Sequence, residues 1–183
     1  SDDWSATTPK LVVQYDLGDD SMMFASYSEG FKSGTFDSFN SAPAIDPEYV
    51  KAFEVGLKST LLDGRVRFNM GAFSYDYTDL QVASFDKSTG IFVNSNAASS
   101  DISGVELEVQ YVVSDHLYID FSGGWLDAKY NEFLSPNNIL DTGIAGSDPV
   151  DLTGNTLRGA PELSYSLAVE YRTPTPLGEL SVR

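Results

Sequence analysis

The sequence predicts an all-β protein: an antiparallel barrel of up-and-down strands that crosses a membrane. Three observations predict it. Apolar and polar residues alternate along most of the chain, short and long connections alternate between these segments, and a tyrosine precedes three of the short connections. A sheet crosses a bilayer by closing into a barrel, because every backbone polar group must then find its partner within the protein.

Eight strands are expected from the alternation. They lie near 8–17, 22–32, 48–61, 65–82, 101–114, 116–130, 159–173 and 178–183, and we expect the last to continue past Arg183. Successive side chains of a strand point to opposite faces, so each segment has one apolar and one polar face. In chain order, the clearest apolar faces are Leu11, Val13, Tyr15 and Leu17; Tyr49, Phe53, Val55 and Leu57; Val105, Leu107, Val109, Tyr111 and Val113; Leu117, Ile119, Phe121 and Trp125; and Leu163, Tyr165, Leu167, Val169 and Tyr171.

The fourth strand changes phase in the middle. Its first apolar residues share one parity and its later aromatic residues share the other: Val66, Phe68, Met70 and Ala72, then Phe73, Tyr75 and Tyr77. A bulge near Ala72 would shift the phase. The aromatic side chains could instead face a wide interior, and the sequence leaves both explanations open.

The connections indicate which ends of the strands lie together. Short connections fall at 17–21, 62–64, 114–116 and 173–178, and long ones at 33–47, 85–100 and 131–158. Because every second connection is long, all long loops emerge at one end, as in bacterial outer-membrane barrels. Tyr15, Tyr111 and Tyr171 precede short turns on the apolar parity, which predicts an interfacial aromatic girdle.

Composition excludes several classes of protein. The chain has 183 residues, 11 Lys and Arg against 27 Asp and Glu, one His and no Cys. No apolar run approaches the roughly 18–20 residues of a transmembrane helix. Disulfides and thiolate metal sites need Cys. Nucleic acid is not an expected partner, because a net charge of −16 repels phosphates.

Alternation by itself does not tell the inside of a sheet from the outside. A soluble lipocalin-like barrel also alternates, with its apolar face turned inward. Loop asymmetry, strand length and the level of the tyrosines favour the membrane barrel. A complete eight-stranded outer-membrane barrel with a structural or adhesive role, and a small-barrel enzyme of the outer membrane, are further alternatives.

Five stretches resemble the barrel of TonB-dependent outer-membrane receptors, in the order and at the spacing of that family. They are residues 24–34, 47–58 with its Glu-x-Gly-x-Lys strand, 67–81, 104–108 and 155–162. The resemblance implies a 22-stranded barrel, of which these residues would be about a third. It implies that residues 1–183 are a partial barrel domain that lacks the N-terminal plug domain and the final barrel strand.

The resemblance also implies a function and partners. Members take up a scarce nutrient such as a ferric siderophore, cobalamin or glycan. The expected partners are outer-membrane lipid, the protein's own plug domain, the TonB complex through an N-terminal box, and the small nutrient molecule. Neither plug nor box lies in this sequence, and no enzymatic activity or cofactor is expected.

Candidate functional residues fall into two groups. Charged residues on the polar parity would face the lumen or the plug: Glu54, Lys58, Glu106, Glu108 and Glu162. Aromatic residues in the long loops are candidate ligand contacts, although they could equally pack against neighbouring loops: Phe36, Phe39 and Phe133. We expect no catalytic or metal-binding residue, because His116 has no partner in sequence and no nucleophile motif occurs.

Overall fold

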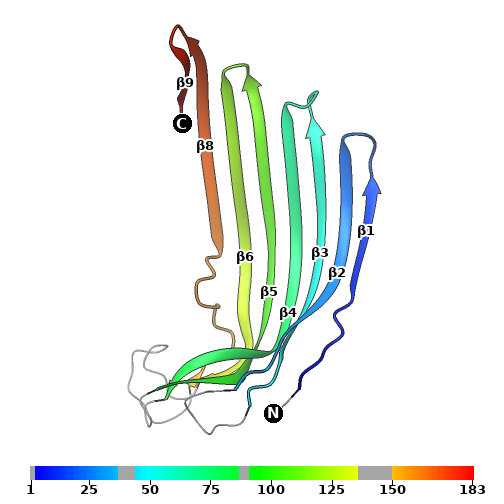
Figure 1. Ribbon diagram of the computed structural model, residues 1–183, viewed down its shortest axis with the longest axis vertical. Helices are drawn as coiled ribbons and strands as arrows, with labels where there is room; N and C mark the ends of the chain where they lie inside the picture. The colour runs from blue at the N-terminus through cyan, green and yellow to red at the C-terminus, as the bar shows by residue number, and fades with distance from the viewer. Residues whose placement is uncertain (1–2, 37–43, 87–90, 136–149) are drawn as a thin grey trace.

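The computed structural model is a single antiparallel sheet (Figure 1). It describes residues 3–36, 44–86, 91–135 and 150–183. The strands of this described part are β1 (Lys10–Asp16), β2 (Ser21–Lys32), β3 (Glu48–Leu61), β4 (Val66–Asp86), β5 (Ile91–Ser114), β6 (Leu117–Ser135), β7 (Val150–Asp151), β8 (Leu163–Thr175) and β9 (Gly178–Val182). Among these residues there is no helix long and apolar enough to cross a membrane.

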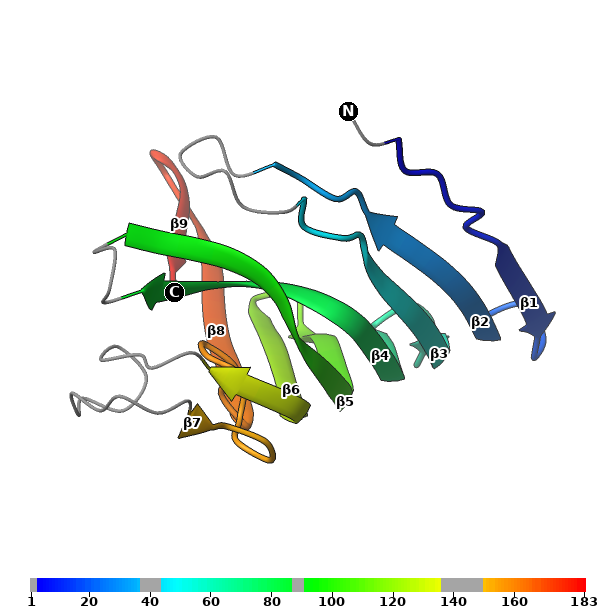
Figure 2. The same ribbon diagram turned by 90° about the horizontal axis from the view of Figure 1, so that it is seen from below.

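Neighbouring strands of the sheet follow one another in the sequence. The order is β1-β2-β3-β4-β5-β6-β8-β9, and the two-residue β7 pairs with the end of β6. The eight expected strands are therefore confirmed, and β7 is an addition. In the described residues β1 pairs only with β2 and β9 only with β8, so the sheet is curved but not closed (Figure 2).

The expected long loop at 85–100 is wrong. β4 runs on to Asp86 and β5 begins at Ile91, so most of this stretch continues the β4–β5 hairpin. Register shifts between Tyr77, Leu80 and Gln81 separate the extension from the rest of the hairpin. Figure 1 shows the hairpin bending sideways at this end. Its Ser- and Asn-rich sequence shows no alternation and therefore predicts a loop rather than a strand.

The phase change in β4 has a clear explanation. Pairing with β3 runs without a shift from Val66 to Thr78, and pairing with β5 runs without one as far as Tyr77. There is no bulge near Ala72. Phe73 lies directly opposite Glu54, so Phe73, Tyr75 and Tyr77 are on the polar side of the sheet. The bulge explanation is therefore wrong, and the explanation that these side chains face the interior of a barrel stays a prediction.

The sheet has one apolar face that the described residues do not cover. Cross-strand pairing places Val55, Ala72, Val105, Trp125 and Leu163 in one row on this face. Exposure is large for many of its apolar side chains, for example 75% for Tyr165 and 66% for Leu11. We call this side the apolar face and the opposite side, which carries Glu54, Glu106 and Glu108, the polar face.

The three tyrosines that precede short turns lie on a sloping line. Cross-strand pairing leads from Tyr15 in β1 to Leu107 in β5, four strands away, and Tyr111 is four residues nearer the turn. From Tyr111 the pairing leads to Val169 in β8, two strands on, and Tyr171 is two residues nearer the turn. The tyrosine position thus shifts by one residue for each strand crossed. With a rise of about 3.3 Å per residue and about 4.8 Å between neighbouring strands, this shift corresponds to a strand tilt of about 35°. Membrane barrels have tilts of about this size, and at this tilt the tyrosines share one level.

Buried apolar side chains gather at the end of the sheet opposite the short turns. In the described part of the chain they are Ile45, Ala98, Ala128 and Phe133. Ala98 and Phe133 are direct partners across β5 and β6. This end, which we call the long-loop end, therefore has a small protein core, whereas the rest of the sheet has none.

Candidate functional site

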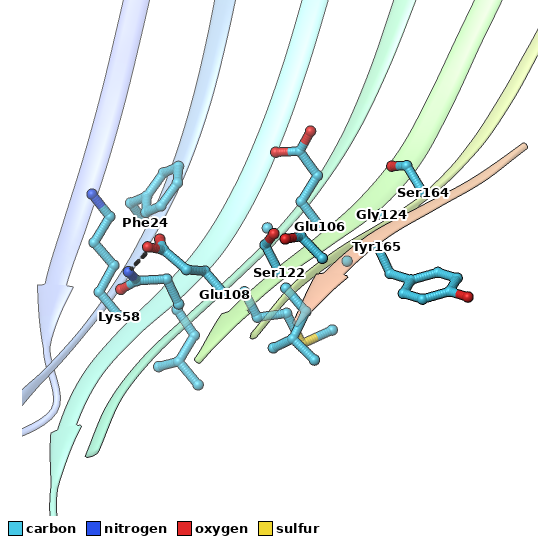
Figure 3. Close-up of a pocket in the computed structure, with 15 residues that line it drawn as sticks. Phe24, Lys58, Glu106, Glu108, Ser122, Gly124, Ser164 and Tyr165 are labelled. Atoms are coloured by element: carbon cyan, nitrogen blue, oxygen red, sulfur yellow. Dashed lines mark hydrogen bonds between the residues drawn. The ribbon is translucent and has the colours of Figure 1, made fainter. Parts of the chain in front are cut away.

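The candidate site is a shallow depression on the polar face, with a volume of about 540 Å³. Its polar-face lining comes from two adjacent rows that cross-strand pairing aligns, in which every residue except Gly56 and Met22 lines the depression. One row is Phe24, Gly56, Gly71, Glu106, Gly124 and Ser164. The other is Met22, Lys58, Asn69, Glu108, Ser122 and Ser166. Figure 3 shows side chains of both rows around the depression.

Glu106 rises between two glycines. Its cross-strand neighbours are Gly71 in β4 and Gly124 in β6. A Cβ atom at Gly71 would have no neighbour closer than 3.9 Å, and one at Gly124 would first meet the hydroxyl of Ser164 at 3.5 Å. Within the described part of the chain the Glu106 carboxylate is exposed and accepts no hydrogen bond. It is therefore an unpaired carboxylate on a strip of the polar face where the neighbouring glycines, Gly71 and Gly124, have no side chains.

Glu108 and Lys58 lie one row closer to the short turns. Asn69 donates from Nδ2 to Oε2 of Glu108 over 3.2 Å, and Gln110 donates to its other carboxylate oxygen over 3.4 Å. The Lys58 Nζ lies 5.9 Å from the centre of the Phe24 ring (Figure 3). A cation over an aromatic face is attracted by the ring quadrupole. Both charges are thus held by polar-face neighbours rather than by each other.

Glu54 belongs to an aromatic cluster farther from the turns. The Tyr75 hydroxyl donates to Oε1 of Glu54 over 2.7 Å. The Tyr75 ring stacks on Phe73, with centroids 4.9 Å apart. Phe73 in turn lies over Gly104, where a Cβ atom would be only 2.7 Å from the ring. The glycine thus makes room for the Phe73 ring on the polar face.

Glu162 is not brought together with the other four charged candidates. It precedes β8, and its Oε1 accepts a hydrogen bond of 3.3 Å from the indole Nε1 of Trp125. Trp125 belongs to the apolar face and is 45% exposed. Glu162 therefore interacts with the edge of the apolar face, whereas Glu54, Lys58, Glu106 and Glu108 share the polar face.

The three aromatic loop candidates have different surroundings. Phe36 is half exposed, and its ring centroid is 5.5 Å from that of Trp4. Phe39 lies outside the described residues. Phe133 was expected in a loop, but it lies within β6, is 6% exposed and packs 4.7 Å from Tyr130. The expected loop position of Phe133 is wrong, because β6 extends to Ser135 and β7 pairs beside its end. Of the two alternatives, exposure and packing, the structure shows packing.

Sequence reasoning missed two amide side chains that organise the long-loop end. Gln81 and Asn96 are direct partners across β4 and β5, and both bond to the backbone of the segment between β2 and β3. No periodicity or motif marks them. His116, which was expected to be an isolated turn residue, has Nδ1 2.8 Å from the carbonyl oxygen of Arg172. No cluster of His, Asp or Glu suited to a metal ion occurs in the described residues.

Comparison with known proteins adds a family. The family model described as "TonB dependent receptor-like, beta-barrel" matches residues 1–182. The ferric-pyoverdine 358 receptor of Pseudomonas putida is 27% identical over 140 residues, 74% of this chain and 17% of that protein. The metal-pseudopaline receptor CntO of Pseudomonas aeruginosa is 28% identical over 125 residues, 68% of this chain and 17% of that protein. The chain spans less than a fifth of the length of these curated relatives.

Solved structures show the same fold. The ferric yersiniabactin uptake receptor FyuA from Yersinia pestis superposes with a TM-score of 0.69 at 19% identity, over 94% of this chain and 24% of its own. BauA, the ferric preacinetobactin receptor from Acinetobacter baumannii, gives a TM-score of 0.66 at 21% identity, over 96% of this chain and 24% of its own. In each case the match is to a section of a larger barrel.

Proposed function

Because the chain belongs to the TonB-dependent receptor-like β-barrel family, we propose that it forms part of the wall of an outer-membrane receptor that takes up a ferric siderophore or a related metal chelate. The observation that carries this proposal is the family match over residues 1–182. The family consists of receptors rather than enzymes, and its barrels lie in the bacterial outer membrane. Membership sets aside the soluble lipocalin-like alternative.

The two faces of the sheet support a place in a barrel wall. In the proposed orientation the apolar face meets lipid, and the polar face with Glu106 and Glu108 lines the lumen. A lipid-exposed side chain gains from being apolar, whereas a lumen-facing carboxylate keeps its water. The sloping line of tyrosines supports the same orientation, because phenols favour the membrane interface.

The partners in this proposal lie beyond the present residues. The plug domain of the same protein would contact the polar face, and the TonB complex would act through an N-terminal box. Residues 1–183 would be one section of the barrel domain. The short turns would then face the periplasm and the long-loop end the cell exterior, as is usual for such barrels.

The choice of a metal chelate comes from the relatives. Two of them are named as receptors for ferric pyoverdine and metal-pseudopaline. Cobalamin and glycans are the other nutrient classes that the family resemblance suggests. The chain itself offers Phe36 as an exposed aromatic at the long-loop end, together with the uncovered charges of the polar face.

The test is uptake in cells that lack the whole gene. Cells with and without the gene would be starved of iron and supplied with iron-55 bound to pyoverdine, to a catecholate siderophore or to a hydroxamate siderophore. We expect the deletion to abolish uptake of one chelate, and the intact gene to restore it. Unchanged uptake of all three, with loss of cobalamin or glycan uptake instead, would overturn the choice of metal chelates.

The size of the native protein tests the alternative of a complete eight-stranded barrel. An antibody raised against residues 48–114 would be used to probe an outer-membrane fraction. We expect a membrane-bound band several times larger than 19.9 kDa. A membrane-bound band near 19.9 kDa would favour the small barrel and remove the basis for active transport. The structure supports the larger protein, because β1 and β9 do not pair with each other in the described sheet.

A further inference from the structure

The side-chain amide of Gln81 joins the two ends of the segment that connects β2 to β3. Its Nε2 donates to the carbonyl oxygens of Ser33 and Asp46, each over 3.0 Å. Ser33 directly follows β2, and Asp46 lies two residues before β3. The backbone N–H of Gln81 donates over 3.0 Å to the carboxylate of Glu48, the first residue of β3. One residue of β4 thus holds both ends of this segment.

Asn96, directly opposite Gln81 in β5, completes the clamp. Its Nδ2 donates to the carbonyl oxygens of Asp46 and Asp79, each over 2.8 Å, and its Oδ1 accepts from the N–H of Asp46 over 2.7 Å. Asp79 has a φ of 56° and lies where β4 shifts register. The shift takes Asp79 out of the β-ladder, and the Asn96 amide gives its carbonyl oxygen a partner.

The held segment is itself folded at its base. Thr35 and Ile45 exchange two backbone hydrogen bonds, of 3.1 and 2.8 Å. Ile45 is 5% exposed. Gly34 is also buried, and the ring of Trp4 lies so close that a Cβ atom would clash with it. The clamp therefore acts on an ordered base.

The extension of the β4–β5 hairpin needs such support. β3 stops pairing with β4 at Thr78, and β6 stops pairing with β5 at Ala98. Beyond these residues, β4 and β5 pair only with each other among the strands of the described sheet. A two-stranded ribbon on its own is marginally stable in water. The amides of Gln81 and Asn96 lie where the flanking strands end and replace part of the lost pairing.

We propose that Gln81 and Asn96 are positioning residues that fasten the base of the β2–β3 segment to the β4–β5 extension, so that the two parts bind ligand as one unit. The ligand part of this proposal rests on the proposed function. The mechanical part does not, because it depends only on the contacts described above. Neither residue is expected to touch the ligand.

Hydrogen exchange tests the mechanical part. The full-length receptor in detergent micelles would carry Asn96→Ala, and the amides of Thr35 and Ile45 would be followed by mass spectrometry. Each of these N–H groups donates to the carbonyl oxygen of the other residue, so the substitution changes their exchange only through the clamp. We expect exchange to become at least about tenfold faster, because Asn96→Ala removes both hydrogen bonds to Asp46 and the net loss of one hydrogen bond already corresponds to about tenfold. Unchanged exchange at Thr35 and Ile45 would overturn the proposal.

Asn94 provides a matched control. It is two residues away on the same strand and face, and its exposed amide bonds to none of the described residues. Asn94→Ala should leave exchange at Thr35 and Ile45 at the wild-type rate. Asn96→Asp keeps the acceptor and loses both donors, so it should give an intermediate rate. The folded band on an unheated gel identifies any variant that has failed to form its barrel.

Binding of ferric pyoverdine tests the ligand part. In a receptor that binds this chelate, we expect Asn96→Ala to raise Kd about tenfold and Asn94→Ala to leave it unchanged. Faster exchange with an unchanged Kd would overturn the role in ligand binding. If the wild-type receptor binds no ferric pyoverdine, that choice of ligand fails, whereas the exchange rates still decide whether the clamp exists.

Discussion

Two regions of this sheet differ in what covers their apolar side chains. In the regular part of the sheet, Phe53 is 51% exposed and Leu167 is 63% exposed, and the described chain does not cover them. At the long-loop end, Phe133 is 6% exposed and packs against Tyr130. In the proposed orientation the bilayer takes the place of a core in the spanning part, whereas the long-loop end is in water and must build its own.

The same contrast holds for polar groups. In the spanning part, regular pairing between neighbouring strands satisfies the backbone, as a bilayer requires. At the long-loop end the pairing shifts register near Asp79, and side chains such as Asn96 supply the missing partners. Regular sheet and lipid stabilise one region, and specific side-chain contacts stabilise the other.

The strongest test removes the lipid. We expect the 183-residue chain, made alone in detergent-free buffer, to aggregate completely. Its apolar face is uncovered, and the edges at β1 and β9 can recruit further strands. Light scattering and size-exclusion chromatography would measure this, with the same chain in micelles as control. A monomer that unfolds cooperatively in plain buffer would show that the spanning part does have a core of its own.

Truncating one phenylalanine in each region sharpens the comparison. Phe133→Ala leaves a cavity in a protein core and should cost about 3–5 kcal/mol of local stability. Phe53→Ala loses contact with lipid, which flows into the space, so only the transfer free energy of about 2 kcal/mol is lost. Hydrogen exchange of the full-length receptor, read at Ala98 for Phe133 and at Val55 for Phe53, measures both. Equal costs would contradict the view that the long-loop end alone has a protein core.

The success of sequence reasoning follows the same division. In the spanning part, alternation predicted every strand, because a residue there faces either lipid or a wet interior. Alternation did not decide on which face Phe73 and Tyr75 lie, because an aromatic side chain can occupy either face where a glycine on the neighbouring strand makes room for it. Gly104 makes that room, and only the register reveals it.

At the long-loop end, sequence reasoning mistook strand for loop. Both faces of the β4–β5 extension lie outside the proposed bilayer, so alternation has no reason to persist there. The sequence left open whether Phe133 is exposed or packed, and the structure shows it 6% exposed and packed against Tyr130. Four of the charged candidates share the polar face, and their position toward a lumen or plug stays a prediction. Glu162 does not join them, because its partner Trp125 is distant in sequence.

A charge placed on either face tests which face meets lipid. Leu107 is on the apolar face, four residues from the interfacial Tyr111 and hence near the middle of the bilayer. Leu107→Arg should cost about 2–4 kcal/mol, the usual penalty for Arg at the midplane of a membrane barrel. Glu108→Arg, one residue on and on the polar face, should cost less than about 1 kcal/mol because it stays in water. Guanidinium unfolding of the full-length protein in lipid vesicles measures both, and a larger penalty at Glu108 would reverse the assignment of faces.

Two glycines of the polar face provide the smallest test, because alanine should affect them in opposite directions. At Gly104 a Cβ atom would lie 2.7 Å from the Phe73 ring and 2.7 Å from the carbonyl oxygen of Trp125. The ring could turn but the backbone oxygen cannot, so Gly104→Ala should destabilise by about 1–3 kcal/mol. At Gly71 the nearest atom is 3.9 Å away, and Gly71→Ala should stabilise by about 0.5 kcal/mol, because alanine loses less backbone entropy in a strand.

The same unfolding assay compares the two variants. A loss of stability at Gly71 as large as at Gly104 would mean that something outside the described residues, such as the plug, packs against the strip beside Glu106, and the polar face would then be a packed interface like the long-loop end.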